Sequence, residues 1–364
     1  MSDPISTQNH LPSDLVKAIL LLLPPKSLGR FKSVSKPWCS FISSHNFIRT
    51  HTLNYTETNP NPDPTHMILV PEDGEFLCSV GIKQLNTQTS PETLTAKRLN
   101  LNFQGQWAEI QGSCNGLVLA NDIHDNLYLV NPTTRKSRKV PDSGVESSFG
   151  IYGFGYDSSK DDYRVISISY KPVSDSDSNL NCTSQVYSLR NNSWNKLPNF
   201  PHKLHDHLCP GVLLNNKLHW VVRNTLSTMT IASFCLADEE FHEIELPDSF
   251  KCIRAASTKL CAVGGKLVVV RCDQFHYELW VMKEYGVPNS WTELCVIYNF
   301  IDLDCELFAQ VNNHDILLGN SSNGIVIHNM DEGRSTSVTV QGYPGEFMVA
   351  GTYVESLESL ERFR

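Results

Sequence analysis

The sequence NSWNKL at residues 192–197 returns almost unchanged as NSWTEL at residues 289–294, which is 97 residues later. Between these two stretches, EEFHEI at 239–244 places a phenylalanine where the tryptophans fall. The same spacing continues outward to KSRKV on one side and RSTSV on the other. The chain therefore contains a repeat of ~40–50 residues. The anchor positions of this repeat, separated by 57, 47, 50 and 44 residues, are Ser137, Trp194, Phe241, Trp291 and Ser335.

A second element recurs with the same period. LNNKLHWVVR occupies residues 214–223 and VGGKLVVVR occupies residues 263–271. Asn215 and Gly264 are 49 residues apart, and Asn312-Asn313 lies about one further period along the chain. Each copy joins two residues that tolerate a positive φ to an alternating apolar run, which is typical of a tight β-hairpin. Repeats of ~40–50 residues made of short strands predict a β-propeller.

The number of repeats favours six blades, although seven remain open. Five units carry the anchors, and a sixth, irregular unit is expected at roughly 66–110, where MILV and EFLCSVGI read as strands. The stretch FMVAGTYVESL at 347–357 could supply a strand that closes the ring with this first unit. We therefore predict a mainly β protein whose propeller covers residues 66–357, followed by a tail at 358–364.

Composition limits the function. The net charge of −9 argues against general nucleic-acid binding, because there is no basic excess to neutralise phosphates. The 11 cysteines are odd in number and form no Cys-x-x-Cys pair. This pattern favours reduced thiols in the cytoplasm or nucleus over a disulfide framework.

The N-terminal region contains the densest apolar run, in LVKAILLLLPPKSLGRFKSVSKPW at residues 15–38. The first 14 residues include Asp3 and Asp14 but no Lys or Arg, which a signal peptide would need. Lys17 interrupts the run, and a membrane span requires ~20 apolar residues. We therefore expect neither export nor membrane insertion.

The same region predicts a small helical module. Ser13 and Asp14 are suitable N-caps for a helix that ends at Leu23, before Pro24-Pro25. Lys26–Lys32 predicts a second helix, the next proline opens a third, and a short fourth follows. Such a module cannot bury all of its apolar residues internally, so the surplus must pack against the rest of the chain or a second protein.

The proline-rich stretch NYTETNPNPDPT at 54–65 reads as a stiff connector between the helices and the strands. We expect it to hold the two parts at a defined separation. The predicted organisation is a disordered N-terminus at 1–10, a helical module at 11–53, a linker at 54–65 and then the propeller.

The stretch LPSDLVKAILLLLPPKSLGRFKSVSKPWCSFISSHNF resembles an F-box. This stretch departs from the family pattern at Ala18, Leu21 and Leu22, where related motifs usually carry polar residues. We therefore expect poor solubility of the chain without a partner. GSCNGLVL at 112–119 and GFGYDSSKDDYRVI at 153–166 resemble the F-box-associated region of plant F-box proteins. The region is similar to a diverged kelch propeller, although only Gly264-Gly265 keeps the kelch double glycine.

This resemblance implies a substrate-recognition subunit of a Skp–cullin–F-box ubiquitin ligase. The helical module would bind a Skp-type adaptor and through it a cullin, while the propeller would bind an unidentified target protein. No catalytic residue, cofactor or metal is expected. Two alternatives stay open, which are an F-box scaffold that does not promote ubiquitination and a propeller that serves as a small-molecule or glycan receptor. The residues that the resemblance assigns to adaptor binding are Leu11, Pro12, Ile19, Leu20, Leu23, Pro24, Leu28, Val34 and Trp38.

Target recognition is expected in loops at one end of the propeller. The candidates are residues 171–183, which include the polar run SDSDSN, and the stretch His202–Cys209. The latter is rich in potential zinc ligands, but no second ligand pair is evident. His-x-x-His would also place the two rings on opposite faces of a strand, so we interpret the stretch as a polar loop.

Two further motifs resemble a nucleophile elbow and a dinucleotide-binding site, but we interpret both as parts of the packed structure. Cys114, within Gly-Ser-Cys-Asn-Gly, has the spacing of a nucleophile elbow, but the following LVLAND reads as a strand instead of the required helix. Gly153-x-Gly155 lacks the third glycine and the helix of a dinucleotide site.

Overall fold

Prolines and capping side chains divide the N-terminal region into helices. The computed structural model describes residues 12–57, 65–82, 85, 93–145, 149–171, 181–198, 200–204, 209–223, 228–250, 257–272, 276–298, 306–312, 314–320, 324–342 and 347–361. Within these residues the N-terminal helices are α1 (Ser13–Leu21), α2 (Pro25–Phe31), α3 (Lys36–Ile42) and α4 (His45–Glu57).

Several helix boundaries differ from the sequence prediction, and α2 and α3 each begin one residue earlier than expected. Pro12 occupies the N-cap of α1, so Ser13 begins the helix and no side chain caps it. Leu22, at the C-cap, ends α1 two residues before Pro24. The fourth helix reaches Glu57 and thus enters the segment predicted as linker.

Among the residues that the structure describes, the remaining regular structure is strand apart from two short 3-10 turns, η1 (Asp248–Phe250) and η2 (Pro288–Ser290). The strands of the first half are β1 (His66–Pro71), β2 (Leu77–Gly81), β3 (Thr93–Leu99), β4 (Trp107–Cys114), β5 (Leu117–Asp122), β6 (Leu127–Asn131), β7 (Lys136–Lys139), β8 (Phe149–Asp157), β9 (Asp162–Lys171), β10 (Asn181–Ser188), β11 (Ser193–Lys196) and β12 (Lys203–Leu204). Those of the second half are β13 (Val212–Leu214), β14 (Lys217–Arg223), β15 (Met229–Cys235), β16 (Phe241–Ile244), β17 (Ser257–Val263), β18 (Lys266–Cys272), β19 (His276–Met282), β20 (Trp291–Tyr298), β21 (Glu306–Gln310), β22 (Asp315–Asn320), β23 (Gly324–Asn329), β24 (Arg334–Gln341) and β25 (Phe347–Tyr353).

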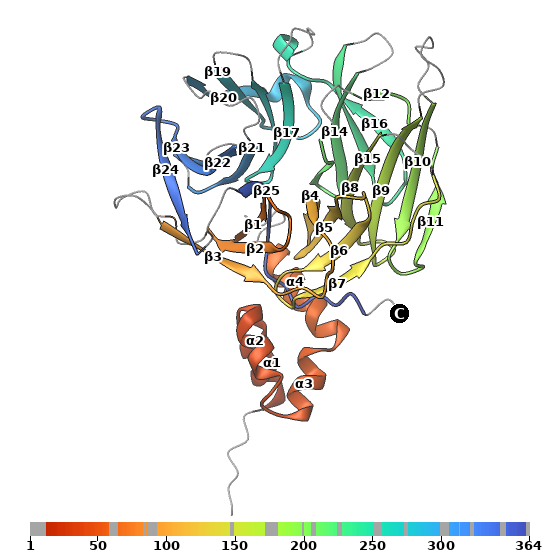
Figure 1. Cartoon of the computed structure of the whole chain (residues 1–364), viewed down its shortest axis with the longest axis vertical. Coiled ribbons are helices and arrows are strands. Elements are labelled where there is room, and N and C mark those ends of the chain that lie inside the picture. The colour runs from red at the N-terminus through yellow and green to blue at the C-terminus, as the bar shows by residue number, and fades with distance from the viewer. Residues whose placement is uncertain are drawn as a thin grey trace, which may run out of the picture.

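The strands form a ring of antiparallel units around a central axis (Figure 1). Hydrogen bonding groups the described strands into five sheets, of which one has eight strands. In that sheet a short parallel ladder, β24 with β3, joins two antiparallel units. Counted as antiparallel units, or blades, the ring contains β25-β1-β2-β3 (blade 1), β4 to β7 (blade 2), β8 to β11 (blade 3), β12 to β16 (blade 4), β17 to β20 (blade 5) and β21 to β24 (blade 6). The predicted β-propeller architecture is confirmed.

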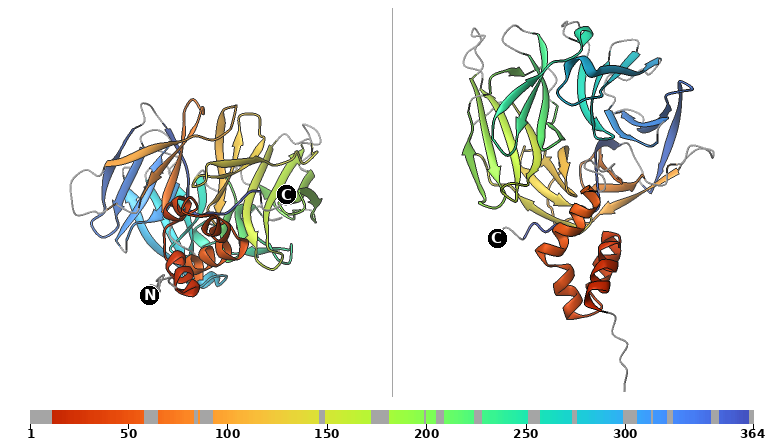
Figure 2. Two further views of the ribbon diagram at one scale, coloured as in Figure 1. Left: turned by 90° about the horizontal axis from the view of Figure 1, so that it is seen from below. Right: turned by 180° about the vertical axis from the view of Figure 1, so that it is seen from behind.

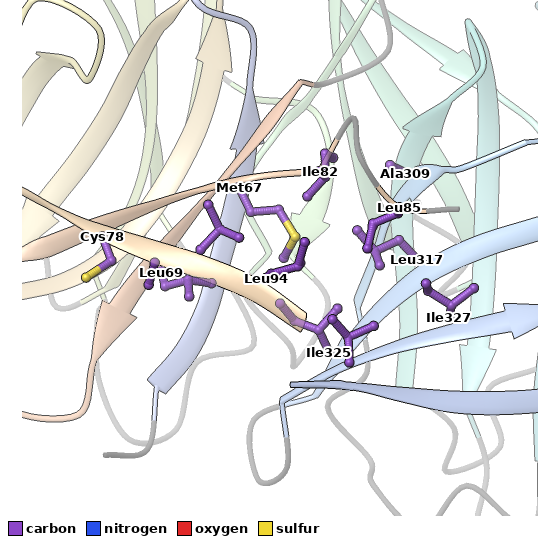
Figure 3. Close-up of a cluster of buried hydrophobic side chains, with 13 residues drawn as sticks. Met67, Leu69, Cys78, Ile82, Leu85, Leu94, Ala309, Leu317, Ile325 and Ile327 are labelled. Carbon is purple, nitrogen blue, oxygen red and sulfur yellow. The ribbon is translucent and has the colours of Figure 1, made fainter. Parts of the chain in front are cut away.

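The last strand closes the ring, as the sequence predicted. β25 pairs antiparallel with β1 from His66↔Tyr353 to Pro71↔Phe347. Buried side chains from blades 1 and 6 then pack against one another, among them Met67, Leu94 and Leu317 (Figure 3). Similar buried clusters lie between the other neighbouring blades, so each blade is stabilised mainly by its two neighbours.

The anchors of the sequence repeat all fall on the outermost strands of their blades. Ser137 lies on β7, and the other four lie on β11, β16, β20 and β24. Trp194 and Trp291 make equivalent contacts with the preceding blade. The indole N–H of Trp194 donates to the Pro141 carbonyl at 2.7 Å, and that of Trp291 donates to the Glu245 carbonyl at 2.9 Å.

The two ends of the ring are connected differently. Asn215-Asn216 and Gly264-Gly265 have positive φ at both positions and form the tight hairpin turns that the sequence predicted, β13 to β14 and β17 to β18. Strand directions place these turns at the end that faces the helices. The strand ends that bound residues 172–180 lie at the opposite end, which we call the far end. Leu204, at the end of β12, also lies there, because it pairs with Val222 near the end of β14.

The helices lie together at one end of the ring, and the C-terminal segment passes between them and the blades (Figure 2). This segment continues directly from β25 and extends to Glu361 in the described structure. Leu360 is buried in the cluster between blades 2 and 3. The part of the predicted tail that is described therefore belongs to the packed structure.

Candidate functional site

Helix α1 carries two apolar stripes at helical spacing. Leu15, Ile19 and Leu22 follow an i, i+4, i+7 pattern, and they are 52%, 50% and 85% exposed. Val16 and Leu20 begin a second stripe that faces inward, and Leu20 is only 1% exposed. The first stripe thus faces solvent, although its residues are as apolar as those of the second.

The inward stripe belongs to the core of the helical module. Phe31 and Trp38 contact edge to face with ring centroids 5.7 Å apart, and Phe41 packs on Phe47 at 5.0 Å. The Trp38 backbone N–H donates to the Ser35 side chain at 3.2 Å, which fixes the start of α3. The buried members of this core are Leu20, Leu28, Ile42, Phe47, Ile48 and, from much later in the chain, Leu357.

The structure separates the predicted adaptor-binding residues into groups. Pro12, Ile19, Pro24 and Val34 are exposed, and Val34 is 63% exposed in the turn after α2. Leu23 and Trp38 are half-buried and pack against the module core, whereas Leu20 and Leu28 lie inside it. Leu11 lies outside the described residues.

The side chains of Leu20 and Leu28 are thus buried in the module core and are not presented at its surface in this structure. Sequence reasoning missed Leu15 and Leu22, which are the exposed neighbours of Ile19. The i, i+4, i+7 spacing would have identified them.

The helical module that carries the exposed stripe has a positive net charge. Residues 12–52 contain six Lys or Arg and one Asp, which gives a net charge of +5 when His is neutral. Because the whole chain carries −9, the residues outside this range carry −14. Burial lowers the pKa of Lys32, while the side chain of Lys26 is 56% exposed and pairs with Glu355.

The loop expected at 171–183 starts and ends at the far end of the propeller, away from the helices, and the stretch His202–Cys209 starts there. Residues 172–180, 205–208 and 199 themselves lie outside the described residues. At the same end Ile123 is 55% exposed, in the turn between β5 and β6. The far end and the helical surface are thus two separate places for binding.

The side chain of His202, a candidate zinc ligand, is packed against neighbouring side chains of the propeller. Its ring is buried, packs edge to face against Phe200, and places Nδ1 3.3 Å from a Glu243 oxygen. Burial lowers the pKa of His202, and the Glu243 carboxylate partly opposes this effect. His205 and His207 lie outside the described residues. Among the residues that the structure describes, no group of His, Cys, Asp and Glu is arranged to hold a metal ion.

The two remaining motifs also contribute to packing. Cys114 ends β4, and a turn through Asn115 and Gly116 leads into β5 instead of a helix. The thiol is buried, which raises its pKa to about 12 and leaves it protonated at neutral pH. Gly153 and Gly155 lie on β8, where side chains of blade 4 press against the backbone.

In the described part of the chain, every helix is too short or too polar to pass through a lipid bilayer.

Comparison with known proteins assigns both parts of the chain. Residues 9–50 match the F-box domain, and residues 68–360 match the F-box associated beta propeller domain. F-box/kelch-repeat protein At3g23880 from Arabidopsis thaliana is 29% identical over 339 residues, which cover 90% of this chain and 89% of that protein. F-box protein CPR1 from the same plant is 29% identical over 313 residues, which cover 79% of this chain and 73% of that protein. The chain belongs to the family of F-box proteins that carry an F-box-associated β-propeller.

Proposed function

We propose that this chain is a substrate-recognition subunit of a Skp–cullin–F-box ubiquitin ligase. The helical module binds a Skp-type adaptor, the adaptor joins the chain to a cullin, and the propeller binds the target protein. Other subunits transfer ubiquitin, so this chain acts by holding target lysines near the conjugating enzyme. The complex operates in the cytoplasm or nucleus, where the cysteines of the chain stay reduced.

The observation that carries this proposal is the exposed stripe on α1. Leu15, Ile19, Leu22 and Val34 make up four of the eight large apolar side chains that are exposed in the described structure. They gather within one small helical module that matches the F-box. Exposed apolar side chains gathered in this way are typical of a protein interface.

The charge around the stripe indicates the chemistry of the adaptor surface. A net charge of +5 over residues 12–52 favours an apolar patch with an acidic rim. We expect the association rate with the adaptor to fall as salt is raised, since exposed charges steer encounter more than they stabilise the complex. The net charge of −14 in the rest of the chain favours a target surface that is neutral or basic.

The test is calorimetric binding of purified Skp-type adaptor to the full chain and to Ile19→Asp/Leu22→Asp. Both positions are exposed, so the module should fold, but an adaptor would have to bury two unpaired carboxylates. We expect binding to weaken more than ~100-fold, because each buried carboxylate costs several kcal/mol.

Ile123→Asp is the matched control, since Ile123 is equally exposed but lies at the far end of the propeller. It should bind the adaptor like the wild type. Adaptor binding by the double variant at wild-type affinity would rule out the α1 stripe as the docking surface.

The ligase role is distinguished from a scaffold role by the lifetime of bound proteins. Proteins captured by the propeller should be degraded more slowly in cells that lack this chain. Unchanged half-lives of all captured proteins would favour the scaffold.

A further inference from the structure

We call residues 354–361 the C-terminal brace. One of its leucines is buried in the helical module, and another is buried in the propeller. Leu357 is 5% exposed and lies in the core of the helical module with Leu20 and Phe47. Leu360, three residues later, is 3% exposed and lies in the core between blades 2 and 3. A single extended stretch of chain therefore contributes to both hydrophobic cores.

Polar contacts hold the brace to blade 2. The side chain of Asn131, at the end of β6, is fully buried and donates to the carbonyls of Ser356 and Glu358 at 3.3 and 2.8 Å. The Ser356 N–H donates to the Thr133 hydroxyl at 3.2 Å, and Arg138 donates to the Leu360 carbonyl at 3.2 Å. Since the amide of Asn131 satisfies two backbone carbonyls, its loss would leave buried acceptors without a partner.

Blade 2 also provides space for the brace. Gly116, in the turn between β4 and β5, has a φ of +80°, and a side chain there would come within 2.8 Å of the Val354 carbonyl. The close approach of the two backbones therefore depends on a glycine at this turn.

One ion pair joins the brace to the helices. The Glu355 side chain, 14% exposed, lies 2.5 Å from Lys26 of α2 and 3.5 Å from His66 at the start of β1. A further pair joins His45 of α4 to Asp161 of blade 3 at 3.6 Å. The helical module is thus joined to the ring by contacts that do not involve the proline-rich linker.

We propose that the C-terminal brace, and not the linker at 54–65, fixes the orientation of the helical module relative to the propeller, with Leu357 and Asn131 as positioning residues. This inference rests in part on the proposed ligase function, because orientation decides which lysines come near the conjugating enzyme. The adaptor surface and the far end of the propeller are then held as one rigid unit.

The test uses the full chain and a zero-length carbodiimide cross-link. This reagent joins an amine directly to a carboxylate, so the Lys26–Glu355 pair reports contact between helices and brace. The Lys136–Glu361 pair, 2.9 Å apart, reports contact between brace and blade 2. Both products are quantified by peptide mass spectrometry.

The expected results separate the two attachments. In Leu357→Ser the Lys26–Glu355 product should be lost while the Lys136–Glu361 product remains, and Leu357→Met should restore the first. Asn131→Ala, which leaves the composition of the module core unchanged, should lower both products and retain adaptor affinity. Glu361→Ala is the matched control and should keep the Lys26–Glu355 product at its wild-type yield, because Glu361 is exposed.

A second readout follows position instead of stability. A ligase is reconstituted with the adaptor and cullin, and the ubiquitinated lysines of the propeller are mapped. Asn131→Ala should change which propeller lysines are ubiquitinated, although its adaptor affinity equals that of the wild type. Insertion of Gly-Ser-Gly-Ser between Asn61 and Pro62 should leave both the cross-links and the modification pattern unchanged.

The proposal is overturned if the linker insertion abolishes the Lys26–Glu355 product, or if Leu357→Ser and Asn131→Ala keep it at full yield. Failure of the wild type to bind the adaptor would instead overturn the proposed function. The cross-link yields would still report on the brace in that case, so the two failures can be told apart.

Discussion

At the scale of single residues, the contact between blades 3 and 4 depends on the absence of a side chain. A Cβ at Gly153 would lie 2.6 Å from the indole of Trp220 and 2.9 Å from Leu218. Gly153→Ala should therefore lower the free energy of unfolding by about 1–3 kcal/mol, as overpacking does. Thermal or urea unfolding of the full chain measures the effect.

Gly29→Ala is the matched control, because a Cβ there would meet nothing within 4 Å. Gly29 lies inside α2, so alanine should stabilise the chain by about 0.5–1 kcal/mol. Equal effects of the two substitutions would show that the glycine at 153 is not required for packing.

His219 gives a prediction on pH. Its Nδ1 lies 3.0 Å from the Val212 carbonyl, which only accepts, so Nδ1 carries the proton and Nε2 accepts from the Tyr285 hydroxyl at 2.7 Å. Burial lowers the pKa of His219 to about 4, and the hydrogen bond to Val212 opposes this in part. The ring is therefore neutral in the folded protein at pH 7.

Unfolding returns the pKa of His219 to about 6.5, so the unfolded chain binds a proton that the folded chain does not. The stability from this group is present above pH 6.5 and is lost as the pH falls towards 4. Between pH 7 and pH 5 the wild type should lose about 2 kcal/mol more than His219→Gln in urea unfolding. Parallel pH profiles for the two proteins would contradict the buried neutral imidazole.

At the scale of elements, replacement by alanine should lower stability much more in the inward stripe of α1 than in the outward stripe. Leu20→Ala removes a buried side chain and should destabilise the helical module by about 2–5 kcal/mol. Ile19→Ala removes an exposed one and should change stability by less than about 0.5 kcal/mol. Hydrogen exchange of the α1 amides measures both, and faster exchange in Ile19→Ala would show that the outward stripe is packed within the chain.

The outer strands give a second prediction at this scale. Trp194→Phe and Trp291→Phe each remove an indole N–H that donates to a carbonyl of the preceding blade. Each should cost about 1–2 kcal/mol in chemical unfolding, because a carbonyl is left without its donor.

Trp280→Phe is the control, since its buried indole nitrogen has no hydrogen-bond partner among the described residues. It should cost less than either of the other two. A larger loss at Trp280 would mean that ring packing, and not the hydrogen bond, sets the effect.

The α1 stripes also show what the sequence could and could not predict. The F-box resemblance identified the helical module, but it grouped Leu20 with Ile19 as adaptor contacts. A motif contains both the residues that hold a module together and those that face a partner. Helical spacing separates the two classes, because neighbours in sequence point in directions about 100° apart.

At the scale of the whole molecule, ring closure depends on the last strand. Removal of residues 347–364 deletes β25 and leaves the inner edge of β1 unpaired. This truncated chain should lose its cooperative thermal transition and elute as aggregates in size-exclusion chromatography. Removal of residues 362–364 alone is the control and should preserve both properties. A cooperative transition in the longer truncation would show that the β24–β3 ladder closes the ring by itself.

The sequence predicted the propeller well because each blade repeats the same local chemistry. Turn residues with positive φ, such as Gly264-Gly265, and the anchors on the outer strands are local signals. The position of the helices relative to the ring could not be predicted in this way. It depends on Leu357, which meets its partners in the helical module only after the whole chain has folded back. No periodicity marks such a residue. The role expected for the linker at 54–65 stays a prediction, and the brace contacts carry the separate proposal made above.

The shared core of the module and the brace has a consequence for biosynthesis. Leu357, which completes the core of the four helices, is translated 300 residues after Glu57 at the end of α4. A nascent or prematurely terminated chain has the F-box sequence without a finished F-box core. Under the proposed function, recruitment through the helical module favours chains that have been translated through the propeller, so the shared core acts as a check that the target-binding part has been made.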